Sequence, residues 1–303
     1  MSRVIVNDVG PRDGLQNQGK ILSPSERVQL IVALLHAGIR HVEVGAFVSP
    51  RAVPAMAGAD EVLAGLVERD VENTVFTVLI PNYRGYEMAI EAGAKSVCMV
   101  LYGSDAMAQA NVRMSREQAE AATADILNRA QADGVRVTAT IAVAFECPFE
   151  GPVDPGVTRD IVARFLDLGA DELCVADTIG AANPGQVRAL TRSLVEEHGA
   201  ERLGCHFHDT RAMGLVNVYA SLESGIRKFD ASVGGLGGCP FAPGASGNVA
   251  TEDVVMMLEQ LGYETGIDLA RLMRASDLAQ ELTGTAPGGR AGGWLKRSLR
   301  KDL

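Results

Sequence analysis

The chain is poor in aromatic residues, carries no excess of positive charge and has no long apolar run. Aromatic side chains make up 5% of its 303 residues, whereas hydrophobic residues make up 47%. A core of mainly small and aliphatic side chains favours packed α/β layers over an all-β sandwich. The net charge of −10 argues against a nucleic-acid or anionic-membrane binder, because both need a positive field. No apolar stretch reaches the roughly 18 residues of a membrane span.

Cysteine pairs and nucleotide-binding motifs are also missing. The five cysteines include no C-x-x-C pair, so neither a disulfide framework nor a structural zinc site is expected. The N-terminus enters a strand-like run directly, without the segments of a secretory signal. We therefore expect a cytoplasmic protein that contacts neither nucleic acid nor membrane. No G-x-G-x-x-G follows the first strand pattern, which argues against a dinucleotide-binding sheet.

Short β-rich runs alternate with amphipathic helix patterns almost to the end of the chain. Several helix patterns begin at Ser, Asn or Thr near a proline and end in glycine, as capped helices do. Eight strands that alternate with helices predict a (β/α)8 TIM barrel, with a doubly wound open sheet as the alternative. The expected strands cover residues 3–9, 41–47, 73–80, 96–102, 136–143, 172–178, 202–208 and 228–233.

The pattern predicts a single TIM-barrel domain over residues 1–303, because no linker separates a second domain. The barrel is expected over about residues 3–262, and a C-terminal helical extension over residues 263–303. The extension ends in a basic run around Trp294. This run is either a solvated terminal segment, which we favour, or a flap that closes over phosphate groups.

Polar residues gather where the predicted strands end. In a TIM barrel these ends meet at one mouth, where reactive groups lie. Each polar residue interrupts an apolar run, and we expect them to converge at the mouth. They are Arg12, Asp13 and Gln16 after the first strand, Glu43 at the end of the second, Asp177 at the end of the sixth, His206 and His208 on the seventh, and Cys239 and Asn248 after the eighth.

The H-x-H pair of His206 and His208 is the main metal signal. Residues i and i+2 of a strand point to the same face, so both imidazoles can face the barrel axis. Asp13 would complete a set of two histidines and one carboxylate, and Asn248 would add a carbonyl oxygen. Such ligands suit Mg²⁺, Mn²⁺ or another divalent ion with open positions. H-x-H pairs also occur without metal, and the predicted position of Asp13 makes a metal site the favoured interpretation.

Arg12 and Cys239 each have a functional and a structural interpretation. Arg12 could bind a carboxylate or stabilise an enolate, or it could only form a salt bridge to Glu43 or Asp177. Cys239 could donate a proton from an exposed loop, or it could be a small buried hydrophobe. We favour function because its loop is rich in glycine, and we expect Cys98, Cys147 and Cys174 to be core residues. The loop itself is expected to be a lid over substrate, with an anion cradle as the alternative.

With these residues the chain resembles the 3-hydroxy-3-methylglutaryl-CoA (HMG-CoA) lyases, metal-dependent lyases of the aldolase type built on a TIM barrel. The resemblance runs from about Val4 to Leu269. Its blocks include "VGPRDGLQN", "EVGAFVSPRAVPAM", "HFHDT" and "GGLGGCPFAPGASGNVATEDVVMML", of which the first and last are highly specific. Claisen-type synthases share the barrel and the Arg-Asp and H-x-H elements, but they lack the glycine loop with its cysteine.

The resemblance implies a role for each candidate residue. Arg12 matches the arginine that stabilises the enolate of acetyl-CoA, and Cys239 matches the loop cysteine implicated in proton transfer. Glu43, Asp177 and Glu252 match acids that matter in the family. The family's metal ligands match Asp13, His206, His208 and Asn248.

The reaction that the resemblance implies is a retro-aldol cleavage of HMG-CoA to acetyl-CoA and acetoacetate, with Mg²⁺ or Mn²⁺ as cofactor. A base, either Asp13 or a water, removes the proton of the C3 hydroxyl. The C2–C3 bond then breaks, and Cys239 or a water protonates the resulting enolate. Arg12, Gln16 and Glu252 are expected to bind the acyl-CoA. A homo-oligomer (dimer or tetramer) and a place in leucine degradation are further implications.

Some departures from the family pattern leave the substrate open. Arg211-Ala212 stands where the family has Tyr-Gly, Met114 lies in a changed segment, and Cys174 replaces a serine. The alternative substrates are a 3-hydroxy-3-alkylglutaryl-CoA and citramalyl-CoA. A Claisen-type synthase acting on acetyl-CoA and a 2-oxo acid, and a metal- or CoA-binding protein without turnover, are the remaining hypotheses.

Overall fold

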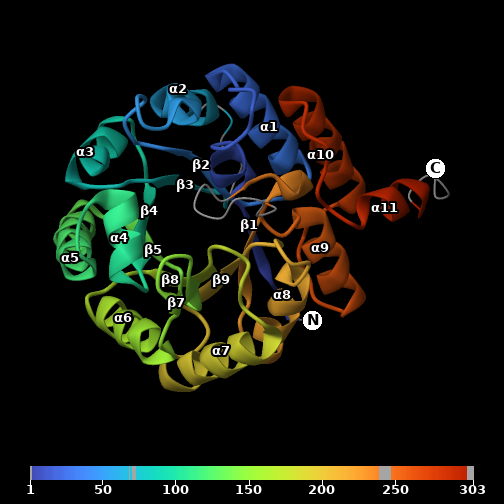
Figure 1. Cartoon of the computed structure of the whole chain (residues 1–303). Helices are drawn as coiled ribbons and strands as arrows, with labels where there is room; N and C mark the ends of the chain where they lie inside the picture. Colours follow the sequence, from blue (N-terminus) through green and yellow to red (C-terminus); the bar gives the residue numbers. More distant parts are fainter. Residues whose placement is uncertain (1, 68, 70–72, 239–246, 299–303) are drawn as a thin grey trace.

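The computed structural model describes residues 2–67, 69, 73–238 and 247–298. Eight parallel strands close into a barrel that is surrounded by helices (Figure 1), so the predicted TIM barrel is confirmed. Around the barrel the order of hydrogen-bonded strands is β1-β10-β9-β8-β5-β4-β3-β2. These strands are β1 (Ile5–Asp8), β2 (His41–Ala46), β3 (Val75–Leu79), β4 (Ser96–Tyr102), β5 (Arg136–Ala142), β8 (Glu172–Asp177), β9 (Leu203–Phe207) and β10 (Lys228–Ala231).

The helices that cover the barrel begin at the capping residues that the sequence offers. Ser23 and Asn183 each form a capping box, and a proline follows each of them at the first helical position. The helices are α1 (Pro24–His36), α2 (Ala59–Val67), α3 (Tyr83–Glu91), α4 (Asp105–Val112), α5 (Arg116–Asp133), α6 (Pro155–Asp167), α7 (Pro184–His198), α8 (Gly214–Glu223), α9 (Thr251–Gln260), α10 (Leu269–Thr283) and α11 (Gly292–Ser298). Among those that are described, none is both long and apolar enough to cross a membrane.

Short elements were not predicted from the sequence. These are α2, α4 and the small antiparallel pair β6 (Glu146–Cys147) and β7 (Gly151–Pro152). Eight or nine residues cover little more than two helical turns, so their periodicity does not distinguish a helix from a loop. Tertiary packing stabilises both: α2 packs against β2 and α1 on the outside of the barrel, and α4 borders the cavity at the mouth.

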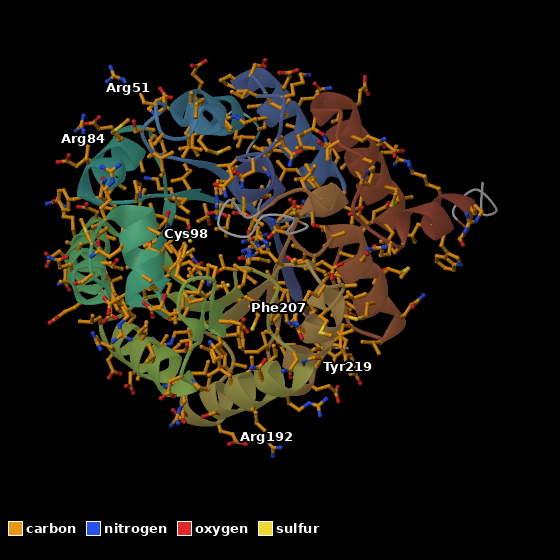
Figure 2. The ribbon with its side chains drawn as sticks, in the orientation of Figure 1. Arg51, Arg84, Cys98, Arg192, Phe207 and Tyr219 are labelled. Carbon is orange, nitrogen blue, oxygen red and sulfur yellow. The ribbon has the colours of Figure 1, made fainter. Side chains whose placement is uncertain are left out.

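The interior of the barrel is polar, whereas the hydrophobic core lies between the strands and the helices. Along β9, Cys205 and Phe207 are buried in the core, and His206 between them lines a cavity. This cavity has a volume of about 730 Å³ and follows the barrel axis. In Figure 2 side chains converge on the centre of the barrel, while Arg84 and Arg192 point outward. The usual filling of a TIM barrel by branched side chains is therefore replaced by polar groups around a cavity.

The C-terminal extension packs against the outside of the barrel beside α1 (Figure 1). The Asp268 backbone N–H donates to Ala37 O at 2.7 Å, and Arg271 Nη1 donates to His36 O at 3.1 Å. In the described part of the basic run, Lys296 pairs with Asp277 at 2.5 Å. One backbone and one side-chain hydrogen bond thus tie the extension to the barrel, in addition to the burial of its helices.

Candidate active site

A short π-helical turn, η1 (Gly10–Gly14), carries Arg12 and Asp13 directly after β1. Such turns often occur at functional sites. Its two end residues are glycines, and a side chain at either position would come too close to the ends of β1 and β10. A Cβ on Gly10 would lie 2.7 Å from Asp8 Oδ1, and a Cβ on Gly14 would lie 2.7 Å from Ser232 Oγ. This close approach brings Asp13 to the segment that leads out of β10.

Asp13, His206 and His208 form a buried cluster at the mouth of the barrel. One potential ligand atom from each lies within 4.8 Å of the others. The Asn248 amide adjoins them, because its Nδ2 donates to Asp13 Oδ2 at 2.8 Å. His208 was expected on the seventh strand, but β9 ends at Phe207, and His208 instead forms an isolated bridge with Asn248. The structure therefore brings together all four residues that were predicted as metal ligands.

Two atoms of this cluster are buried without a hydrogen-bond partner. They are His208 Nδ1 and Asn248 Oδ1. A buried polar atom without a partner costs about 1–3 kcal/mol, so such atoms call for an explanation. A bound cation would satisfy lone pairs of this kind. The nitrogen and oxygen donors of the four residues suit a hard or borderline divalent ion.

Arg12 joins the cluster to Glu43. Its Nη1 donates to Asp13 Oδ1 at 2.7 Å, and its Nη2 donates to Glu43 Oε2 at 2.7 Å. Gln16 Nε2 donates to the same Asp13 oxygen at 2.9 Å. Glu43 was expected at the end of its strand; that position was wrong, because β2 continues to Ala46. Glu43 thus lies inside the barrel rather than at its rim, and from there it binds the Arg12 guanidinium.

The electrostatics keep Asp13 ionised and His208 neutral. Burial opposes ionisation of Asp13, but the charges of Arg12, His206 and His208 outweigh it and lower the pKa to about 2. Burial lowers the pKa of His208 to about 4. Burial also lowers the pKa of His206, but the hydrogen bond to Asp230 and the charge of its carboxylate outweigh burial and raise the pKa overall. An ionised carboxylate and a neutral imidazole are the forms that bind metal.

Asp177 does not contact Arg12 but organises the loop after β8. Its carboxylate accepts from the backbone N–H groups of Ala181 and Ala182 at 2.8 and 3.0 Å. Arg211 holds the same loop from the other side, since its guanidinium donates to the carbonyl oxygens of Gly180 and Ala181. Arg211 was expected to mark a change of substrate, and the structure places its side chain on this loop. Asp177 and Arg211 together stabilise the loop after β8 by hydrogen bonds to its backbone.

Asp230 is a site residue that the sequence reasoning missed. It lies on β10 next to His206, and it accepts a hydrogen bond from His206 Nδ1 at 3.1 Å. An acid in the middle of the "KFDASV" strand pattern was a usable signal, because its neighbours are mostly apolar. The expected parallel neighbour of that strand carries His206. Only the register between the two strands shows that the acid and the imidazole meet.

Cys239 lies outside the described residues, as does the following part of its loop through residue 246. The described cysteines, Cys98, Cys147, Cys174 and Cys205, are all buried. The first three were predicted to be core residues: all three are buried, but of these only Cys147 lies in a hydrophobic cluster, and Cys98 lines the cavity. Two of these thiols also face polar partners, because Cys98 lies 3.5 Å from Thr140 Oγ1 and Cys174 lies 3.6 Å from Asp230 Oδ2.

Glu252 is completely buried at the start of α9 and does not line the cavity, although it was expected to bind substrate. Its carboxylate accepts from the Gly234 backbone N–H at 3.0 Å and from Ser276 Oγ at 3.1 Å. Gly234 follows β10 and Ser276 belongs to α10. Glu252 therefore links the start of the glycine-rich segment to the C-terminal extension.

Replacing Glu252 by glutamine is expected to stabilise the protein at pH 8. Burial raises the pKa of Glu252 to about 7, so the folded state holds a proton that the unfolded state releases above its ordinary pKa of 4.5. The contribution of Glu252 to the free energy of unfolding therefore falls by up to about 3 kcal/mol as the pH rises from 4.5 to 7. The glutamine amide keeps an acceptor oxygen for the Gly234 N–H and can donate its own N–H to the Ser276 hydroxyl oxygen, without that loss. The thermal midpoints of the two proteins should converge toward pH 4.5 and separate toward pH 8; equal midpoints at pH 8 would contradict the prediction.

Comparisons with known proteins agree with this geometry. The model of the HMGL-like family matches residues 3–279. The chain belongs to the HMGL-like family. It is 44% identical over 285 residues to the (R)-citramalyl-CoA lyase of Chloroflexus aurantiacus. The aligned region covers 91% of this chain and 90% of the relative. It is 42% identical over 292 residues to the hydroxymethylglutaryl-CoA lyase of Pseudomonas mevalonii, which covers 96% of both chains.

A solved structure extends the likeness to three dimensions. The HMG-CoA lyase of Acinetobacter baumannii, in complex with coenzyme A and 3-methylmalate, superimposes with a TM-score of 0.91. The two sequences are 38% identical, and the superposition covers 96% of this chain and 94% of the A. baumannii chain. The protein is therefore a carbon–carbon lyase of the HMG-CoA lyase type, as the sequence resemblance predicted.

Proposed function

We propose that this protein cleaves HMG-CoA to acetyl-CoA and acetoacetate with the help of a divalent metal ion. The observation that carries the proposal is the buried cluster of Asp13, His206 and His208, placed beside Arg12 at a cavity of about 730 Å³. The cavity is within the size range of small-ligand sites, so it is large enough for the acyl group. The relatives that act on acyl-CoA thioesters support the same substrate class.

The metal site is expected to be built from Asp13, His206, His208 and Asn248. When bound there, Mg²⁺ or Mn²⁺ would polarise the C3 hydroxyl of the substrate and lower its pKa. The low pKa of Asp13 makes this carboxylate a weak proton acceptor and a permanent anion. It therefore suits the role of ligand better than the role of base, which a water molecule can fill.

Arg12 is proposed to stabilise the negative charge that forms on the thioester oxygen. As the proton leaves the C3 hydroxyl, the C2–C3 bond breaks and its electrons form the enolate of acetyl-CoA. Two nitrogens of Arg12 are held by Asp13 and Glu43, while its Nε is buried without a partner. A fixed guanidinium with an unused N–H is a preorganised donor for an oxyanion. Protonation of C2 completes the reaction, and Cys239 or a water molecule is the proposed donor.

Purified, metal-replete protein is expected to release acetyl-CoA from HMG-CoA, and removal of the metal by EDTA should abolish the release. Added Mn²⁺ or Mg²⁺ should restore it, because the chelator removes the ion and leaves the site residues intact. The assay measures acetyl-CoA and acetoacetate by chromatography. Release that persists after complete metal removal would contradict the metal-dependent mechanism, and failure with every branched 3-hydroxyacyl-CoA would contradict the lyase.

Citramalyl-CoA is the second candidate substrate, favoured by the 44% identity to an (R)-citramalyl-CoA lyase. A substrate panel with HMG-CoA, longer 3-hydroxy-3-alkylglutaryl-CoA esters and both citramalyl-CoA enantiomers distinguishes them by kcat/KM. Incubation with acetyl-CoA and 2-oxo acids, followed by measurement of free thiol, tests the Claisen-type synthase. A cytoplasmic location, a dimer or tetramer, and a place in leucine degradation stay predictions.

A further inference from the structure

Asp230 faces His206 across two neighbouring strands in the interior of the barrel. The two residues are direct partners in the parallel pairing of β10 with β9. His206 Nδ1 and Asp230 Oδ2 are 3.1 Å apart, and the side chain of His206 is about 10% exposed. The pair is therefore largely shielded from water, and their hydrogen bond is strengthened by the charge of the carboxylate.

Asp230 is itself held in place by two other strands. Asn7 on β1 donates from its Nδ2 to Asp230 Oδ1 at 2.8 Å. Cys174 on β8 points its thiol at Asp230 Oδ2, at 3.6 Å. Both carboxylate oxygens thus have donors from separate elements of the barrel wall. The carboxylate cannot rotate away from His206 without losing one of them.

This arrangement decides the state of His206. In the neutral form of His206, Nδ1 carries the hydrogen that the Asp230 carboxylate accepts, so Nε2 carries the lone pair and the ring is held in one orientation. His208 differs, because its Nδ1 is buried and has no partner in the described part of the chain. Of the two histidines in the cluster, His206 has its Nδ1 hydrogen-bonded to a carboxylate, whereas His208 has only its Nε2 near one, 4.0 Å from Asp13 Oδ2.

We propose that Asp230 is the positioning residue of the metal site, and that the triad of Asn7, Asp230 and Cys174 sets its affinity for divalent cations. The inference rests on the proposed metal-dependent function. Asp230 acts only through His206: it holds the imidazole in the tautomer and rotamer that binds a cation. Loss of such an outer partner typically costs about 10–100-fold in metal affinity.

The test is a titration of Mn²⁺ into the metal-free, full-length protein, followed by calorimetry and by the electron paramagnetic resonance of the free ion. Asp230→Asn offers one acceptor oxygen where the carboxylate offers two, so it cannot serve His206 and Asn7 equally. We expect this variant to bind Mn²⁺ about 10–100-fold more weakly. Lyase activity should then require more Mn²⁺, while kcat at saturating Mn²⁺ should recover most of its value.

Glu172→Gln is the matched control. Glu172 is another acid inside the barrel, where it pairs with Lys228 at 2.5 Å and Arg136 at 3.2 Å. Its loss disturbs a charge cluster of the same barrel interior but leaves His206 and its partner in place. Its thermal midpoint is expected to fall while its Mn²⁺ affinity stays unchanged.

Unchanged Mn²⁺ affinity in a folded Asp230→Asn protein overturns the inference and leaves the lyase proposal standing. If Asp230→Asn does not fold, Asn7→Ala decides, because it removes only the donor that fixes the carboxylate. A severalfold loss of Mn²⁺ affinity in that variant supports the role of Asp230, and an unchanged affinity overturns it. A wild-type protein that binds no Mn²⁺ overturns the metal-dependent function, and the inference with it.

Discussion

Substitution of His208 by alanine is expected to abolish the release of acetyl-CoA from HMG-CoA, with a loss of more than about 100-fold at saturating Mn²⁺. This exceeds the roughly 10–100-fold that an outer partner of a metal ligand contributes, because a direct ligand is removed. His208 is buried and belongs to the cluster whose ligand atoms lie within 4.8 Å of one another. Higher Mn²⁺ concentrations should not restore the activity. Product formation and Mn²⁺ binding are measured on the same preparation.

His36→Ala is the control for this experiment. His36 is an exposed histidine at the end of α1, and its side chain takes no part in the cluster. It should keep wild-type activity and Mn²⁺ affinity. If His208→Ala retained activity within about tenfold of the wild type, a difference of only 1.4 kcal/mol in transition-state energy, the site would have been assigned wrongly.

Replacement of Arg12 by glutamine is expected to lower kcat by about 100- to 1000-fold, the usual effect of removing one donor to a developing oxyanion. KM should change much less, since the guanidinium acts mainly on charge that appears in the transition state. Arg12→Lys keeps the charge but loses the planar fork that binds Asp13 and Glu43 together. We therefore expect it to recover only part of the activity. Steady-state kinetics at saturating Mn²⁺ measure both variants.

The same substitution should also change the pH dependence of metal binding. In the wild type the pKa of Asp13 is about 2, so its ionised form is lost only as the pH falls toward that value. The positive charge of Arg12 lowers the pKa of Asp13 and also acts to lower those of His206 and His208. Without Arg12 all three pKa values should rise, and Mn²⁺ should be released at a higher pH than in the wild type. Arg192→Gln, on the exposed surface of α7, is the control and should match the wild type in kcat and pH profile. An Arg12→Gln protein with near-normal kcat would exclude Arg12 from enolate stabilisation.

Local sequence patterns predicted the barrel and most of its mouth. Strand and helix patterns alternate along the sequence. This alternation specifies a parallel barrel, because neither a strand nor a helix can bury its apolar face alone. The i, i+2 spacing of His206 and His208 places both on one face, and the polar residues after the first and eighth strands then lie on the same rim. The cluster of Asp13 with the two histidines confirms that expectation.

The remaining features depend on contacts between segments that are distant in the sequence. Glu43 lies deeper than the strand end that was assigned to it, because it is the third residue of β2; the expected strand over residues 41–47 already implied this depth, but its contact with Arg12 depends on the neighbouring strand. Glu252 faces away from the cavity because α10 brings Ser276 to it. No local pattern encodes either packing contact.

Sequence alone thus determined the fold class, the face on which the histidines lie and the candidate ligands, since these follow from the spacing of residues within single elements. The tertiary structure decided which side chains meet across elements. The partnership of Asp230 with His206 is the main example: the two are 24 residues apart, and only the register of β10 against β9 makes them neighbours. Register is set by closure of the whole barrel, so strand patterns taken one at a time do not reveal it.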